Sequence, residues 1–123
     1  TLFARYYANK GEIMAAKKWL NIGGFCGREH ENFGDLSYGE QRMILIMRSV
    51  VKDPKILILE DPCHGLDENS RQKVLSLLEV IANQRITTIL HVTHDVTEVM
   101  PFEKHILELK LNERSMYEIK EMN

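Results

Sequence analysis

Apolar residues recur at helical spacing in three segments of the chain. The clearest case lies in residues 68–83, where apolar side chains occupy the i, i+3, i+4 and i+7 positions of one helix face. Similar stripes occupy residues 12–22 and the segment that opens at Leu36 and stops at Asp53 and Pro54. The pattern predicts a helix in each of these segments and a loop over residues 25–35.

Continuous apolar runs predict the strands. Residues 56–59 are apolar on both faces, as in a strand buried inside a parallel sheet. Residues 86–92 are rich in β-branched residues and predict a second strand of this buried type. A short helix is expected over 96–100, followed by a hairpin of strands at 106–111 and 116–119 that turns through 112–114. The order helix, strand, helix, strand favours a parallel α/β layer.

The composition is that of an ordinary globular chain, with 123 residues, 44% hydrophobic and 28% charged. The formal net charge is -2 and the basic residues are spread out, so nothing indicates a nucleic-acid partner. No apolar run approaches the roughly 20 residues of a membrane-spanning helix. Cys26 and Cys63 fit no metal spacing, and we expect both to be reduced residues that pack in the interior.

Polar residues stand where the predicted strands end. Glu60 and Asp61 follow the first strand, and Thr93, His94 and Asp95 follow the second. Ligands of open parallel sheets bind just beyond the carboxyl ends of the strands, so these residues mark the expected site of a metal-bound phosphate. A separate helix opens after Leu36, and its free N–H groups and dipole favour an anion.

Four motifs in this order resemble those of the nucleotide-binding subunit of ABC-type ATPases, over roughly residues 34–95. Leu-Ser-Tyr-Gly-Glu at 36–40 resembles the family signature, and Leu-Glu-Asp-Pro at 59–62 resembles the end of a Walker B strand. Leu66 and Asp67 resemble the D-loop, and His94 resembles the switch histidine. The signature has an aromatic residue, Tyr38, at its third position, and this makes it most similar to the signature of the molybdate-transport and photorepair-type branch.

The resemblance implies a role for each motif. The signature would dock on the γ-phosphate of ATP held by the opposite subunit, through Ser37, Tyr38, Gly39 and Glu40. Asp67 would cross the dimer interface, and His94 would reach the γ-phosphate and the attacking water. The simpler alternative is that Ser37 and Asp67 only cap helices and that His94 is a structural residue at a strand end.

The two carboxylates depart from the family pattern. Glu60 matches the residue that holds Mg²⁺, mostly through water, and Asp61 matches the carboxylate that orients the attacking water. The family has Asp first and Glu second, whereas this chain has the reverse. Asp is about 1.5 Å shorter than Glu, and misplacement by about 1 Å can cost on the order of 100-fold in rate. We therefore predict slow hydrolysis with ATP binding largely kept, and Asp61→Glu should alter turnover of the intact protein.

The chain contains no phosphate loop of the form G-x-x-x-x-G-K-[ST] and no clear glutamine loop. We expect residues 1–35 to be the tail of a helical subdomain and residues 36–123 the C-terminal part of the ATPase core. The expected fold class is α/β, a partial P-loop NTPase-type parallel sheet with flanking helices and its N-terminal part missing. Alone, the chain should neither bind ATP tightly nor hydrolyse it, and its sheet should leave an apolar face uncovered.

The function that the resemblance implies is the ATP-binding and ATP-hydrolysing subunit of an ABC transporter, powering import of a solute such as an oxyanion. It implies ATP and Mg²⁺ as cofactors, a second ATPase module as dimer partner and a transmembrane permease subunit. The expected location is cytoplasmic, peripheral at the inner face of the cell membrane, without direct nucleic-acid binding. Two alternatives stay open: an ABC-type DNA-repair or chromosome-associated ATPase, and a hydrolysis-poor regulatory module gated by ATP.

Overall fold

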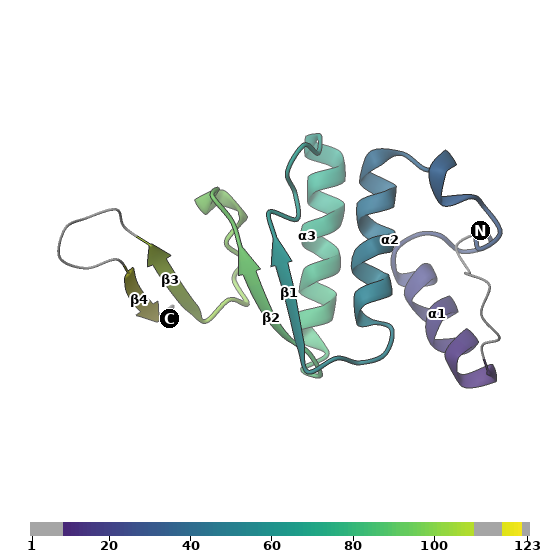
Figure 1. The fold of residues 1–123 in the computed structure, drawn as a ribbon, viewed down its shortest axis with the longest axis horizontal. Helices are drawn as coiled ribbons and strands as arrows, with labels where there is room; N and C mark the ends of the chain where they lie inside the picture. The colour runs from purple at the N-terminus through teal and green to yellow at the C-terminus, as the bar shows by residue number, and fades with distance from the viewer. Residues whose placement is uncertain (1–8, 110–116, 122–123) are drawn as a thin grey trace.

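The computed structural model of the chain describes residues 9–109 and 117–121. The α-helices are α1 (Lys10–Ile22), α2 (Tyr38–Val50) and α3 (Glu68–Asn83), and the 3-10 helices are η1 (Phe33–Asp35) and η2 (Val96–Glu98). The strands are β1 (Ile56–Glu60), β2 (Thr88–Val92), β3 (His105–Leu109) and β4 (Tyr117–Glu121). Figure 1 shows α1, α2 and α3 side by side, with β1 and β2 next to α3 and the β3–β4 hairpin beyond β2.

The α-helices lie where the apolar stripes predicted them, because the residues that begin and end each helix lie next to its stripe in the sequence. α1 begins at Lys10, earlier than the predicted residue 12, because Asn9 caps it. The Asn9 side chain accepts a hydrogen bond from the Glu12 N–H at 2.9 Å, and the Glu12 carboxylate accepts one from the Asn9 N–H at 3.4 Å. After α1 the chain turns through Gly24, whose φ of +83° suits glycine and few other residues.

β1 and β2 form the parallel pair that the alternation of helices and strands predicted, and α3 connects them. The fold class is therefore confirmed as α/β with a parallel sheet and flanking helices. β2 begins at Thr88 rather than at the predicted residue 86. Arg85 has a φ of +56°, and the Thr87 hydroxyl donates to the Pro54 carbonyl at 2.7 Å. This connection holds the residues before β2 in a turn, so they cannot extend the strand.

The hydrophobic core lies between α2, α3 and one face of the sheet. Val74 and Leu78 on α3 are both 0% exposed, and Val50 on α2 is 1% exposed. Leu57 is the buried residue of β1 and belongs to the same cluster. Burial of these apolar side chains, worth about 25 cal/mol for each Å² removed from water, fixes the helices against the strands.

The other face of the sheet is apolar and exposed, so the prediction that both strands are buried on both faces is wrong. Ile56 and Ile58 are 62% and 66% exposed, and Leu90 and Val92 on β2 are 54% and 42% exposed. Side chains alternate between the two faces of a strand, and the helices cover only the face that carries Leu57. The expectation that the chain leaves an apolar sheet face uncovered is confirmed.

The segment after β2 follows the prediction in outline. η2 takes the place of the predicted helix at 96–100, and β3 and β4 pair antiparallel as the predicted hairpin. The predicted strand end at 110–111 and the turn at 112–114 lie outside the described residues. None of the helices within 9–109 and 117–121 combines the length and the apolar character that crossing a bilayer requires.

The cysteines differ in their surroundings. Cys63 is buried, and this burial raises the pKa of its thiol to about 11, which makes it an unreactive packing residue. Cys26 is exposed, so the expectation that it also packs in the interior is wrong. Both thiols are free, as predicted.

Candidate functional site

The parallel register brings the polar ends of β1 and β2 to one edge of the sheet. Glu60 is paired with Val92 at the end of the ladder. The Asp61 N–H then donates to the Val92 carbonyl at 2.7 Å, which extends the pairing one residue beyond β1. His94 follows closely after β2, so Asp61 and His94 meet at this edge.

Asp61 and His94 are in direct contact. The Asp61 carboxylate lies 3.1 Å and 3.2 Å from Nδ1 of His94 and accepts a hydrogen bond from the His94 N–H at 3.3 Å. The bond to the His94 side chain lowers the pKa of Asp61, so this carboxylate is ionised at neutral pH. The His94 side chain is 85% exposed. The pair therefore presents a carboxylate and an imidazole to solvent, groups that can orient a water molecule and hold its proton.

Glu60 is exposed at the end of β1, beside the Asp61–His94 pair. Within the described residues no group of three or more His, Cys, Asp or Glu side chains could hold a metal ion. This does not conflict with Mg²⁺, which is commonly held by one or two carboxylates, several waters and the phosphates of a nucleotide. Glu60 and Asp61, consecutive in the sequence, supply the one or two carboxylates that such a site needs.

The signature segment forms the start of α2. The Ser37 hydroxyl accepts a hydrogen bond from the Glu40 N–H at 3.2 Å, and the Glu40 carboxylate accepts one from the Ser37 N–H at 3.1 Å. This capping box is the simpler role considered for Ser37, and it begins α2 at Tyr38. Tyr38 itself is 55% exposed at the first turn.

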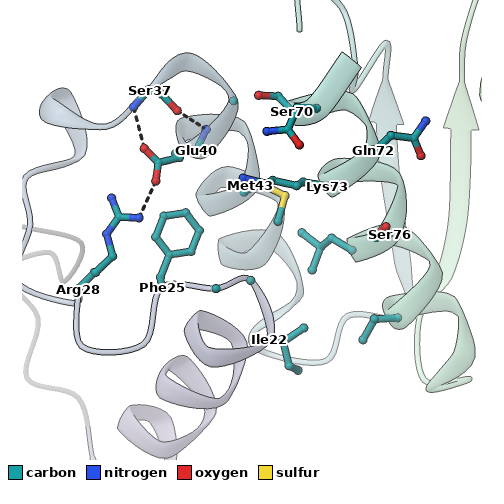
Figure 2. A pocket seen from close by; sticks show the side chains of 16 residues that line it. Ile22, Phe25, Arg28, Ser37, Glu40, Met43, Ser70, Gln72, Lys73 and Ser76 are labelled. Atoms are coloured by element: carbon teal, nitrogen blue, oxygen red, sulfur yellow. Dashed lines mark hydrogen bonds and ion pairs between the residues drawn. The ribbon is translucent and has the colours of Figure 1, made fainter. Parts of the chain in front are cut away.

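Arg28 contacts the signature segment, and the sequence did not indicate this contact. Its Nη1 lies 2.6 Å from the Glu40 carboxylate. Figure 2 marks this ion pair with a dashed line. The bond to Arg28, followed by the bond to the Ser37 N–H, lowers the pKa of Glu40. Arg28 comes from the loop between α1 and α2, twelve positions before Glu40, and no local pattern could connect the two.

Gly39 has a packing role in addition to the expected phosphate approach. A Cβ atom at this position would lie 2.4 Å from the Ser70 hydroxyl oxygen and 2.7 Å from the Ser70 Cβ. Only glycine lets the first turns of α2 and α3 approach this closely. Gly39, Ser37 and Glu40 line a cavity of about 580 Å³ that also reaches Lys73 on α3 (Figure 2).

The predicted site residues thus fall into two groups. Glu60, Asp61 and His94 lie at the sheet edge and do not line the cavity beside the signature. Ser37, Gly39 and Glu40 line that cavity. This separation fits the implication that the signature acts on a nucleotide held elsewhere.

Asp67 begins α3 as its N-cap. Its carboxylate accepts a hydrogen bond from the Ser70 N–H at 2.7 Å, and this bond lowers the pKa of Asp67. The capping role is therefore present within a single chain, next to the place where α3 meets α2. The proposed contact of Asp67 across a dimer interface is compatible with it.

Replacing Asp67 with alanine is expected to lower the melting temperature at pH 7, because α3 loses an ionised cap. The pKa of Asp67 lies below its ordinary value of 3.8 in the folded protein, so this stabilisation is present above that pH and disappears as the pH falls through the lowered pKa. Melting curves of wild type and Asp67→Ala should converge below about pH 4. Asp67→Asn, which keeps an uncharged acceptor, is the matched control. A wild type–alanine difference that stays constant down to about pH 2 would contradict this account.

His91 is a buried residue of β2, with its side chain 4% exposed. It is also paired, because its Nδ1 lies 2.6 Å from the Glu103 carboxylate. Its Nε2 makes no hydrogen bond and lies 4.0 Å from Glu98, whose carboxylate accepts a bond from the Thr93 hydroxyl at 2.8 Å. This buried cluster fixes the chain on both sides of His94.

Comparison with known proteins identifies the family. The family model described as ABC transporter matches residues 3–64, half of the chain. The chain therefore belongs to the ABC transporter family.

Curated relatives carry related names. The chain is 42% identical over 100 residues to the uncharacterized ABC transporter ATP-binding protein YlmA of Bacillus subtilis, covering 80% of this chain and 37% of the relative. It is 37% identical over 93 residues to the ABC transporter ATP-binding protein ModF of Escherichia coli, covering 75% of this chain and 19% of the relative. It is 33% identical over 89 residues to the zinc uptake system ATP-binding protein ZurA of Listeria innocua, covering 72% and 34%. The chain thus spans well under half the length of these relatives.

Solved structures share the fold. A putative metal-chelate type ABC transporter in an inward-facing conformation superposes with a TM-score of 0.77 at 24% identity, covering 97% of this chain and 46% of that one. A dimeric ATP-binding cassette in a post-hydrolysis state, bound to ADP and Pi, gives a TM-score of 0.72 at 24% identity, covering 98% and 51%. At these identities the likeness extends to the fold alone.

Proposed function

We propose that this chain is part of the ATP-binding and ATP-hydrolysing subunit of an ABC transporter. The observation that carries the proposal is the contact between Asp61 and His94 at the carboxyl edge of two parallel strands. An ionised carboxylate and an imidazole at such an edge suit attack of water on a phosphate. The phosphate loop would come from outside these 123 residues, since their sequence contains none.

Each residue at the edge has a separate role in this proposal. Asp61 orients and polarises the attacking water, and His94 holds the γ-phosphate and that water in line. Glu60 would hold Mg²⁺, an ion that usually keeps several of its waters. Bound Mg²⁺ would supply charge neutralisation at the phosphates, while the protein contributes positioning.

The signature and the D-loop act between two ATPase modules. Ser37, Tyr38, Gly39 and Glu40 of one module close over the ATP of the other, with Asp67 at the interface. The dipole of α2, whose N-terminus lies at this segment, supports an anion there. In this arrangement residues 1–35 belong to a helical subdomain and 36–123 to the ATPase core, and a transmembrane permease holds the dimer peripherally at the cytoplasmic face.

The identity of the transported solute is the most specific part of the proposal. The relatives named above include a zinc uptake protein and ModF, and another is named for import of aliphatic sulfonates. Import of an oxyanion, as in the molybdate-transport branch, is supported by the aromatic third position of the signature, Tyr38. A hydrolysis-poor regulatory module gated by ATP is the second candidate, and the reversed Glu60–Asp61 order favours it.

Replacing His94 with alanine in the intact native protein is expected to reduce Mg-ATP turnover on the order of 100-fold. The imidazole that contacts the Asp61 carboxylate is lost. The measurement is steady-state phosphate release at saturating ATP. His30→Ala, at an exposed position in the loop before α2, is the matched control and should stay within about twofold.

Three results separate the candidates. Turnover in the wild type with a specific loss in His94→Ala supports the ATPase. ATP-dependent association of two copies without turnover in the wild type favours the regulatory module. If the wild type shows neither turnover nor ATP-dependent association, both candidates are ruled out.

A further inference from the structure

Arg42 joins the signature helix to the turn that follows β1. It lies on α2, one turn after Tyr38, and its guanidinium crosses to the backbone beyond the strand. Its Nη1 donates to the Asp61 carbonyl at 3.2 Å and to the Pro62 carbonyl at 2.8 Å. The residues it reaches are 19 and 20 positions away in the sequence, so this is a tertiary contact.

The turn that Arg42 holds has an unusual backbone. Asp61 has a φ of +42°, a region that residues other than glycine rarely occupy. Such a conformation persists only where neighbouring groups stabilise it. The Asp61 carbonyl also accepts a bond from the His64 N–H at 3.0 Å, so the turn and the guanidinium share this oxygen. The conformation matters because it directs the Asp61 carboxylate to His94.

The other side of the same guanidinium is bound to the signature. Its Nη2 donates to the Tyr38 hydroxyl at 2.9 Å, and its Cζ lies 5.4 Å from the centre of the Tyr38 ring. The planar guanidinium can make these bonds in fixed directions at the same time, which an ammonium group cannot. One side chain therefore bonds the third signature residue and the backbone of the candidate catalytic carboxylate.

We propose that Arg42 is a positioning residue for ATP hydrolysis, which holds the Asp61 turn in register with the signature through Tyr38. The inference rests on the proposed function. In the dimer, Tyr38 would contact the nucleotide of one site and Asp61 would serve the other. A shift of Tyr38 when the signature closes would be carried through the guanidinium to the Asp61 carboxylate. Arg42 thus gives each site a physical route to the state of its neighbour.

The first test needs no nucleotide. NMR spectra of the nucleotide-free protein are compared for wild type, Arg42→Lys and Arg48→Lys, the last an exposed arginine near the end of the same helix. Arg42→Lys should move the resonances of Asp61 and His94, because lysine cannot bond both carbonyls and Tyr38 together. Arg48→Lys should leave them in place. If Arg42→Lys does not fold, Tyr38→Phe, which removes only the bond at 2.9 Å, should produce a smaller shift of the same resonances.

The second test uses the intact native protein. Arg42→Lys is expected to lower kcat for ATP about tenfold or more while KM for ATP stays within about twofold, since positioning is lost and ATP contacts are kept. Tyr38→Phe should reduce the Hill coefficient for ATP toward one. Unchanged Asp61 and His94 resonances, or a folded Arg42→Lys with wild-type kcat, would overturn the proposal. A wild type without ATPase activity would instead refute the proposed function and leave the NMR result standing.

Discussion

Replacing Asp61 with asparagine is expected to reduce ATP turnover of the intact native protein on the order of 100- to 1,000-fold. Asparagine has the same shape and keeps an oxygen for the His94 N–H, so the fold around the edge should persist. What is lost is the negative charge that polarises the attacking water. The measurement is steady-state phosphate release, together with ATP affinity, which should change little.

Glu79→Gln is the matched control for this charge removal, because Glu79 is exposed on α3, away from the sheet edge. Its turnover should equal that of the wild type within about twofold. Turnover of Asp61→Asn within the same twofold range would contradict the role assigned to Asp61.

Replacing Leu78 with alanine is expected to lower the free energy of unfolding by about 3–5 kcal/mol. Leu78 is 0% exposed between α3 and the sheet, so the truncation leaves a cavity in the centre of the core. This loss is a large part of the roughly 5–15 kcal/mol that stabilises a typical domain. The measurement is equilibrium unfolding in urea, followed by circular dichroism.

The control for Leu78 is Val80→Ala on the same helix, where the side chain is 37% exposed. It should change the free energy of unfolding by less than about 1 kcal/mol. A loss below about 1 kcal/mol for Leu78→Ala would show that the core is packed differently around α3.

The sequence predicted α3 to the residue, because its apolar stripe and the capping aspartate are both local features. The sequence-based prediction that β1 is buried on both faces was wrong. A run of apolar residues shows that a strand can be covered on both faces, but the covering groups lie elsewhere in the sequence. In the described residues only the face that carries Leu57 is covered, while Ile56 and Ile58 remain exposed.

The sequence likewise predicted one part of the candidate site and missed another. The meeting of Asp61 and His94 could be inferred because parallel strands bring their carboxyl ends to one edge. The contacts of Arg42 and Arg28 could not, because each arginine bonds a residue far along the chain and leaves no periodic signal. The strained backbone at Asp61 was equally invisible, since aspartate gives no sequence sign of a φ of +42°.

The most direct test of the account is the mass of the Asp61→Asn intact protein in solution, measured by sedimentation with and without Mg-ATP. If the signature of one module closes over the nucleotide of another, ATP should convert single copies into dimers, and Asp61→Asn should hold them in that state. Adding Ser37→Arg, which places a bulky side chain at the start of α2, should abolish the conversion. An unchanged mass at saturating ATP would contradict the composite ATP site on which the proposed function depends.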